Sequence, residues 1–415
     1  MKTRREFLSD LGIIATSAVL VNSYPWFSAF GQSQNTNAEK VKLAIIGTGS
    51  RGRYLLNILS KNPKVEIAAF CDNYAPSLQE ALKIVPGVPV FFDYRKMLEN
   101  KSINGVVIAT PLNTHAQIVL DSFSAEKHIF CEKSLTLTVN DSLAIYNVYK
   151  QSKKVLFIGH QRMFDPRYLK TMEMIKSGVI GDIQKINTFW YRNGDWRRPV
   201  PSAELERKIN WRLYKEYSGG LMTELASHQL QVGNWAMNAI PETIMGSGSI
   251  FHWKDGREIY DNVSVIYTYP NGCKMTFDSV ISNKFYGLEE QILGTKGTIE
   301  PEKGKFYFEN IAPASGILQL INDIEKNVFS AIPLAGPTWA PETASKNEGE
   351  YLLGKHPDHD GSELLLEAYV EAVITGNKVP KLVENGYYSS IFSLLGLQAM
   401  DEQKIIKFPD YLKID

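Results

Sequence analysis

Short apolar runs recur along the first part of the chain, and each is followed by a polar turn and then by helical spacing of apolar residues. The runs lie at 41–46, 65–70, 88–92, 105–109, 128–131 and 155–159, and helical segments between them include 53–60, 94–100 and 119–124. Continuous β-branched runs are typical of parallel strands covered on both faces. The alternation predicts a doubly wound α/β sheet over residues 41–160.

The pattern changes after Gly181. Strand-like runs separated by turn signals such as "PNGC" and "GTKGT" lie at 183–192, 242–252, 261–269, 273–281 and 289–293. A helix carrying His228 interrupts them, and amphipathic helices are predicted at 361–377 and 386–401. These elements predict a second α/β domain over residues 161–415. Residues 310–360 form an insertion rich in Pro, Gly and small residues, which the pattern does not place.

The amino terminus has the order of an export signal. In "MKTRREFLSDLG", Arg4 and Arg5 precede an apolar run at 11–21 and small residues at 29–31. The run is too short to span a bilayer as a helix. We therefore expect a twin-arginine signal peptide over residues 1–32 and a periplasmic location. The alternative is an ordinary basic terminus on a cytosolic protein. Because twin-arginine export carries folded proteins, any cofactor has to be bound before export.

Charge and cysteine content narrow the class of protein. The 45 basic and 45 acidic residues cancel, so no electrostatic footprint indicates nucleic acid or an anionic membrane surface. The three cysteines form no disulfide framework, and there is no CxxC or HExxH pattern, so no zinc motif is legible. The composition is that of a globular protein with small-molecule partners and no metal.

A glycine loop follows the first predicted strand. Gly47, Gly49 and Gly52 have the GxGxxG spacing, and Asp72 ends the second strand 20 residues after the last glycine. In dinucleotide-binding proteins these glycines permit the tight turn, the approach of the diphosphate and close helix packing, while the acid binds the ribose hydroxyls. We predict NAD as the cofactor, because a carboxylate at Asp72 repels the 2′-phosphate of NADP. Arg51 weakens this preference, since an arginine there can reach such a phosphate.

Five stretches together resemble the Gfo/Idh/MocA oxidoreductases, named for glucose–fructose oxidoreductase and inositol dehydrogenase. They are "GTGSRG", "ATPLNTH", "CEKSLTLT", "GHQRMFDPRYLKTMEMIKSGVIGDI" and "GGLMTELASHQLQVGNW". The family pattern Glu-Lys-Pro is here Glu132-Lys133-Ser134. The resemblance implies a Rossmann NAD-binding domain followed by a substrate-binding and oligomerisation domain with a large, mostly antiparallel sheet. It also implies a homo-oligomer.

The resemblance makes Lys133 the catalytic acid/base or its close partner, with a pKa that desolvation lowers. His228 is the second catalytic candidate, and Glu224 lies four residues before it. On an α-helix these two share a face, so Glu224 is expected to orient a neighbouring group or the substrate. Glu224 and His228 are alternatively two metal ligands, although no third is evident.

The loops at the strand ends supply the predicted cofactor contacts. These are Gly47, Gly49, Ser50, Arg51, Gly52, Asp72, Thr110, Pro111, Asn113, His115, Glu132, Lys133 and Gln161. The aromatic and basic segment "FWYRNGDWRRPVP", followed by "INWRLYKEYSGG", suits the C–H faces and hydroxyls of a sugar, or alternatively is aromatic core with a surface loop. The predicted substrate contacts are Arg162, Trp196, Arg197, Trp211, Arg212 and His228, with Arg162 alternatively a structural ion-pair partner.

An exported nicotinamide enzyme finds no free NAD pool, so its cofactor has to be carried and recycled within the reaction. The leading hypothesis is an NAD-dependent oxidoreductase acting on C3 of a sugar or glycoside. A second hypothesis is a glycoside hydrolase that acts through transient C3 oxidation and elimination. A third, of another class, is a non-catalytic sugar or nucleotide sensor.

Overall fold

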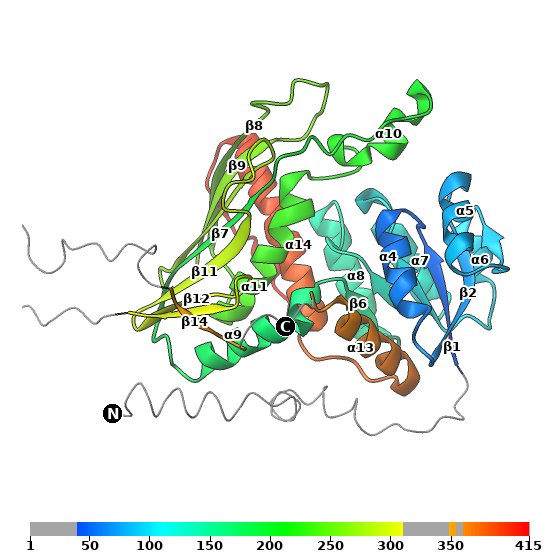
Figure 1. The fold of residues 1–415 in the computed structure, drawn as a ribbon, viewed down its shortest axis with the longest axis horizontal. Helices are drawn as coiled ribbons and strands as arrows, with labels where there is room; N and C mark the ends of the chain where they lie inside the picture. Colours follow the sequence, from blue (N-terminus) through cyan, green and yellow to red (C-terminus); the bar gives the residue numbers. More distant parts are fainter. Residues whose placement is uncertain (1–39, 310–347, 354–359, 415) are drawn as a thin grey trace, which may run out of the picture.

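The computed structural model describes residues 40–309, 348–353 and 360–414 (Figure 1). The predicted signal peptide and most of the insertion at 310–360 lie outside the described residues. Within the described part of the chain, no helix has the length and apolar character needed to cross a membrane.

The first domain is the predicted parallel sheet, with six strands in the order β3-β2-β1-β4-β5-β6. The strands are β1 Val41–Ile46, β2 Val65–Cys71, β3 Val90–Phe91, β4 Gly105–Ile108, β5 His128–Cys131 and β6 Leu156–Ile158. The connecting helices are α4 Ser50–Leu59, α5 Ala75–Ile84, α6 Tyr94–Leu98, η1 Leu112–Thr114, α7 His115–Ser124 and α8 Val139–Gln151. From β1 the chain first adds strands on one side, β2 and β3, and then crosses to the other side for β4, β5 and β6. Ligands bind in such sheets at this switch point, at the carboxyl ends of β1 and β4.

The second domain is a nine-stranded mixed sheet in the order β14-β13-β12-β11-β7-β10-β9-β8-β15. β7 pairs in parallel with β10, and the other described pairs are antiparallel. The strands are β7 Ile183–Tyr191, β8 Thr243–Ser249, β9 Asn262–Thr268, β10 Lys274–Val280, β11 Leu288–Gly294, β12 Gly297–Glu300, β13 Lys305–Phe308, β14 Glu350–Tyr351 and β15 Ile406–Lys407. The two sheets confirm the predicted fold class.

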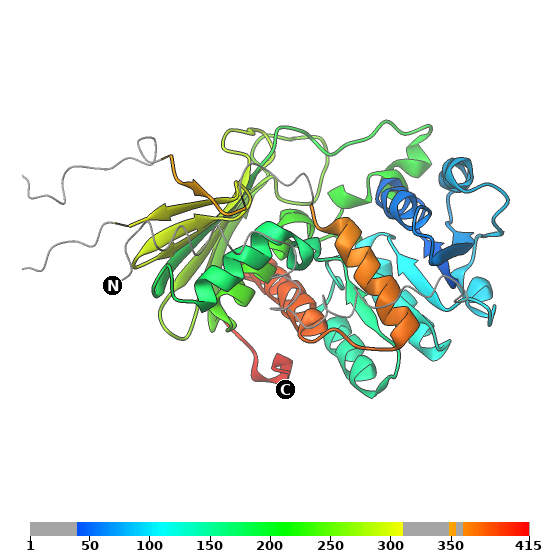
Figure 2. The same ribbon diagram turned by 60° about the horizontal axis from the view of Figure 1, so that its bottom comes forward.

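Two long helices, α11 Ser227–Met237 and α14 Leu382–Glu402, lie between the large sheet and the first domain (Figure 1). A Cβ on Gly386 of α14 would lie 2.3 Å from the Ile158 side chain, so this helix approaches β6 closely. α13 Ser362–Thr375 returns to the first domain (Figure 2), where the Tyr369 hydroxyl donates to the Val106 carbonyl at 3.1 Å. Packing between the domains is therefore extensive, which fixes how residues of both meet at the site.

The remaining short elements connect these layers. They are η2 Gln161–Phe164, α9 Pro166–Lys176, η3 Ala203–Leu205, α10 Glu206–Ile209, η4 Trp211–Leu213, η5 Met222–Ala226 and η8 Asp410–Leu412. Of these, η5 is a π-helix that leads directly into α11. Such wide turns are frequent at functional sites.

Candidate active site

The glycine loop after β1 has the geometry that a dinucleotide diphosphate requires. Gly47 has a φ of +90°, and a Cβ there would lie 2.6 Å from the Ala109 carbonyl oxygen. A Cβ on Gly52 would lie 1.9 Å from the carbonyl oxygen of Gly47, so α4 packs close to the strand only with glycine there. The Cβ position of Gly49 faces open space. The amino end of α4 is thus accessible to a diphosphate, and the residues present fit NAD.

Asp72 is held at the end of β2 beside this loop. One carboxylate oxygen accepts from the backbone N–H of Thr48 at 2.7 Å and from its hydroxyl at 3.1 Å, and the other accepts from the N–H of Tyr74 at 2.8 Å. These bonds orient the carboxylate for the ribose hydroxyls. Arg51 does not turn toward this position, because its Nε pairs with Glu132 at 2.6 Å. The arrangement agrees with NAD rather than NADP.

The turn after β4 carries the next predicted cofactor contacts. The Thr114 hydroxyl donates to the Thr110 hydroxyl at 2.8 Å, and Pro111 and Asn113 lie between them. His115 is 2% exposed, and its ring nitrogens lie 3.0 Å from the carbonyl oxygens of Ser134 and Thr110. Burial lowers the pKa of His115. The histidine therefore braces two loops, and its ring nitrogens are already occupied.

Lys133 follows β5 at the same edge of the sheet. Its Nζ donates a short hydrogen bond to the backbone carbonyl of Glu224, which reaches it from the second domain. Burial lowers the pKa of Lys133 to about 8, against the opposing charges of Glu224 and Glu132. An amine in this range is a competent proton acceptor near neutral pH.

Ser134, where the family pattern has proline, also binds a backbone carbonyl of η5. Its hydroxyl donates to the carbonyl of Thr223 at 2.9 Å, so consecutive residues of the first domain bind consecutive carbonyls of the π-helix η5. The peptide bond between Lys133 and Ser134 is cis. The departure from the family pattern thus adds a hydrogen bond that proline cannot make.

His228, at the start of α11, is 6% exposed. The centroid of its ring lies 6.0 Å from that of His160 and 5.5 Å from that of Trp190. Burial, together with the charges of Lys133 and Arg162, lowers its pKa well below the ordinary value. The imidazole is therefore neutral at neutral pH. Among the described residues, Nδ1 of His228 is buried without a hydrogen-bond partner.

Glu224 is predicted from the sequence to share a helical face with His228 and to orient a neighbouring group or the substrate. Glu224 lies in the π-helix η5 just before α11, and among the described residues its carboxylate is not hydrogen-bonded to His228. Its carboxylate instead accepts from Arg212 Nε at 2.8 Å and from the Ser218 hydroxyl at 3.3 Å. Although burial raises the pKa of Glu224, the charges of Arg212 and Lys133 outweigh it and the pKa is lowered.

The predicted substrate residues divide into two groups. Arg212 lies 4.1 Å from the Trp211 ring centroid and, through Glu224, belongs to the Lys133 site. Arg162 forms a buried ion pair of 2.5 Å with Glu290, which is the structural alternative weighed for it. The neighbouring Gln161 has a buried amide oxygen that no described residue binds.

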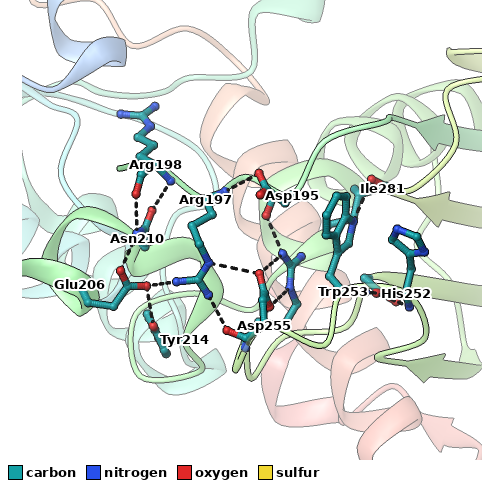
Figure 3. A network of polar contacts seen from close by, with 12 residues as sticks. Asp195, Arg197, Arg198, Glu206, Asn210, Tyr214, His252, Trp253, Asp255 and Ile281 are labelled. Atoms are coloured by element: carbon teal, nitrogen blue, oxygen red, sulfur yellow. Dashed lines mark hydrogen bonds and ion pairs between the residues drawn. The ribbon is translucent and has the colours of Figure 1, made fainter. Parts of the chain in front are cut away.

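The other two predicted substrate residues, Trp196 and Arg197, make structural contacts. Arg197 pairs with Glu206 and, at 3.2 Å, with Asp255 (Figure 3). Trp196 has a φ of +63° and packs against the hydrophobic core. Within the described ranges, no group of three His, Cys, Asp or Glu side chains has the arrangement of a metal site.

The sequence pattern assigned no role to His160 or Glu290. His160 Nε2 lies 3.1 Å from the Ser389 hydroxyl, and burial with the charge of Lys133 lowers the His160 pKa to about 3. Glu290 lies on β11, 128 residues after Arg162. No sequence signal connects residues so far apart. His160 lies two residues after the end of β6, and this position at a strand end is the signal that the sequence offers for it.

The fold and the glycine loop define an NAD-binding oxidoreductase built on a Rossmann domain. Residues 41–160 match the oxidoreductase family with an NAD-binding Rossmann fold, and residues 168–300 match the GFO/IDH/MocA C-terminal domain. The two matches span more than half of the chain. The chain belongs to the Gfo/Idh/MocA family, and its cofactor is NAD.

Among curated relatives, the scyllo-inositol 2-dehydrogenase (NAD(+)) of Bacillus subtilis is 24% identical over 63% of this chain and 73% of its own. A glycosyl hydrolase family 109 protein of Stenotrophomonas maltophilia is 26% identical over 48% of this chain and 46% of its own. A levoglucosan dehydrogenase in complex with NADH and levoglucosan superimposes with a TM-score of 0.70 at 16% identity, covering 90% of this chain and 100% of its own. The structural likeness concerns the fold.

Proposed function

We propose that this protein oxidises or reduces a secondary hydroxyl of a sugar or glycoside, at C3 of the ring, with a tightly bound NAD that is recycled. The observation that carries this proposal is the meeting of Lys133 and His228 beside the cofactor loop. The Lys133 amine binds the carbonyl of Glu224, four residues before His228, and its charge acts on the His228 pKa. A base and a neutral hydrogen-bonding imidazole are what alcohol oxidation needs.

NAD held at the loop of Gly47, Gly49 and Gly52 would supply the hydride acceptor for oxidation of the carbinol carbon. Neutral Lys133 takes the hydroxyl proton as the C–H bond breaks and the carbonyl forms. The neutral imidazole of His228 binds the reacting oxygen and holds the carbon in position. In the reverse direction, protonated Lys133 returns the proton to the oxygen. Geometry contributes much of the rate, because both groups are fixed by packing between the domains.

The substrate class is supported by both relatives and composition. Relatives named as inositol dehydrogenases and a structural neighbour named as a levoglucosan dehydrogenase act on hydroxylated rings. In this chain, Trp190 lies next to His228, and Trp211 stacks with Arg212 near Glu224. Aromatic faces beside hydrogen-bonding groups suit a sugar ring.

A second function, net glycoside hydrolysis, is supported by the relative named as a glycosyl hydrolase. Transient oxidation at C3 acidifies the C2 proton, a base removes it, and the C1 leaving group departs. Water then adds to the double bond, and the hydride returns to C3. Incubation with an aryl glycoside distinguishes the two functions. Release of the aglycone with unchanged NAD supports hydrolysis, whereas a sugar lighter by two daltons supports net oxidation.

The carried cofactor is tested first by denaturing the purified protein and identifying released nucleotide by mass. Near-stoichiometric NAD or NADH supports a cofactor that is loaded in the cytoplasm and carried through twin-arginine export to the periplasm. Protein that is empty and binds added NAD weakly contradicts the carried cofactor.

A non-catalytic sensor is supported instead if Lys133→Ala keeps every measurable function. Homo-oligomerisation through the second-domain sheet stays a prediction, which sedimentation measures.

A further inference from the structure

A segment of the second domain crosses to the cofactor edge of the first. Residues 195–218, here termed the crossing segment, include α10 and η4, and α10 lies above the first domain (Figure 1). Lys208 Nζ donates to the carbonyl of Asn73 at 2.7 Å, directly after Asp72. Arg198 Nη1 donates to the Ser50 hydroxyl at 3.3 Å, at the first residue of α4. The crossing segment therefore touches both the ribose and the diphosphate positions.

The backbone of Arg198 is held firmly from within this segment. Asn210, which is 3% exposed, accepts from the N–H of Arg198 at 2.7 Å and donates to its carbonyl at 3.0 Å. Asn210 is in turn bound to Glu206 at 3.0 Å, and Glu206 pairs with Arg197 (Figure 3). The Arg198 guanidinium points away from this network. The network thus fixes the backbone of Arg198, whereas the guanidinium takes no part in it.

Positive charge gathers around the cofactor loop, and most of it is already satisfied. Arg51 pairs with Glu132, Arg212 pairs with Glu224, and Arg53 donates to the Thr48 carbonyl at 2.7 Å. Among the described residues, the Arg198 guanidinium has no carboxylate partner and bonds only to the Ser50 hydroxyl. Burial, with the charges of Arg212 and Arg53, lowers the pKa of Arg198. The charge of the Arg198 guanidinium is therefore available to bind an anion at the amino end of α4.

We propose that Arg198 is a ligand of the NAD diphosphate, supplied by the second domain across the amino end of α4. Guanidinium groups bind phosphate oxygens in a planar, charge-assisted geometry. The diphosphate is then held from below by the loop at Gly49 and from above by Arg198. Release of NAD requires the crossing segment to withdraw. The inference rests on the NAD site and gives a physical basis for the proposed carried cofactor.

The test compares Arg198→Gln with Arg207→Gln. Arg207 lies on the same segment, but its guanidinium pairs with Glu258 and Glu216, so the control removes equal charge without touching the site. Calorimetric titration with NAD, on protein from which bound nucleotide has been removed, is expected to show a Kd about 10- to 100-fold higher for Arg198→Gln. Arg207→Gln should stay within about twofold of wild type, and Arg198→Lys should recover part of the affinity.

Equal Kd values for the two glutamine variants overturn the proposal. The proposal is also overturned if NAD-free Arg198→Gln has a clearly lower thermal midpoint than NAD-free wild type, because that result indicates a structural role. Because the Kd ratio is measured on nucleotide-free protein, it does not depend on whether wild type retains NAD through purification. If wild type is empty but the ratio holds, the carried cofactor fails and the role of Arg198 stands.

Discussion

Burial gives Lys133 the pKa that the proposed proton transfer requires. A solvated lysine is almost fully protonated at neutral pH, whereas Lys133 has a pKa of about 8 because the domain junction desolvates it. The residue and its role follow from the sequence through the resemblance. Its partner, the carbonyl of Glu224, lies 91 residues away and is known only from the structure.

Replacement of Lys133 by methionine is expected to lower kcat by about 10²- to 10⁴-fold, because no other described group at the site replaces the proton acceptor. The Kd for NAD should change little, since the diphosphate and ribose contacts are made elsewhere. Steady-state kinetics and NAD titration of the same preparation measure both. A variant that loses NAD affinity and activity together would contradict a purely catalytic role.

The pH dependence should differ in sign between the two directions. Oxidation requires the neutral amine of Lys133, so its rate is expected to rise as pH increases through about 8. Reduction requires the protonated amine, and its rate should fall over the same range. His228 stays neutral throughout because its pKa is well below the ordinary value. Rate profiles from pH 6 to 10 measure this, and the same sign in both directions would exclude Lys133 as the titrating group.

At the scale of elements, the π-helix η5 decides what the site residues do. Its backbone presents the carbonyls of Thr223 and Glu224 to Ser134 and Lys133 of the first domain. A helix at this place is predictable from the sequence, but its type is not. A single extra residue in one turn has no periodic signature and is stabilised by contacts from another domain.

Ser134→Ala tests the contact between the domains at η5. Loss of the hydroxyl bond to Thr223 is expected to destabilise the protein by about 1 kcal/mol. The effect stays small because the Ser227 hydroxyl also donates to this carbonyl, at 3.0 Å. Denaturant titration measures the free energy of unfolding. Ser227→Ala is the matched control, and the double variant should cost more than either change alone.

A second test at this scale concerns the ion pair between η2 and β11. Glu290→Gln leaves the buried Arg162 without its counter-charge, and breaking such a pair costs about 3–5 kcal/mol. Unfolding in denaturant measures the loss. The exposed pair of Glu80 and Lys83 provides the control, because Glu80→Gln should leave the unfolding midpoint unchanged. Similar midpoints for both variants would show that Arg162 is hydrated rather than paired.

At the scale of the whole molecule, the two domains share the cofactor site. The first supplies the glycine loop, Asp72 and Lys133, and the second supplies His228 and the crossing segment. If Arg198 binds the diphosphate as proposed, NAD is expected to dissociate slowly, in agreement with the proposal that the protein leaves the cytoplasm already loaded. Folding around NAD before export is also thermodynamically favourable, because a ligand that binds only the native state stabilises it.

The export route has its own test at the amino terminus. Replacement of Arg4 and Arg5 by lysine is expected to block twin-arginine export and leave the protein in the cytoplasm with NAD bound. Cell fractionation followed by immunoblotting measures this. A conservative control changes Lys2 to arginine, which keeps the pair intact. Periplasmic protein from the double lysine variant would contradict the proposed route.

The sequence by itself determined the parallel sheet, the glycine loop, Asp72 and the position of Lys133. These features depend on local backbone geometry and on fixed spacing, which a linear pattern records. Only the tertiary structure decided that Arg197 and Arg162 pair with carboxylates, that η5 is a π-helix, and that Arg198 reaches the cofactor loop. The physical reason is that a long charged side chain takes whichever partner the fold brings near it. Those partners lie tens to more than a hundred residues away, as with Asp255 and Glu290.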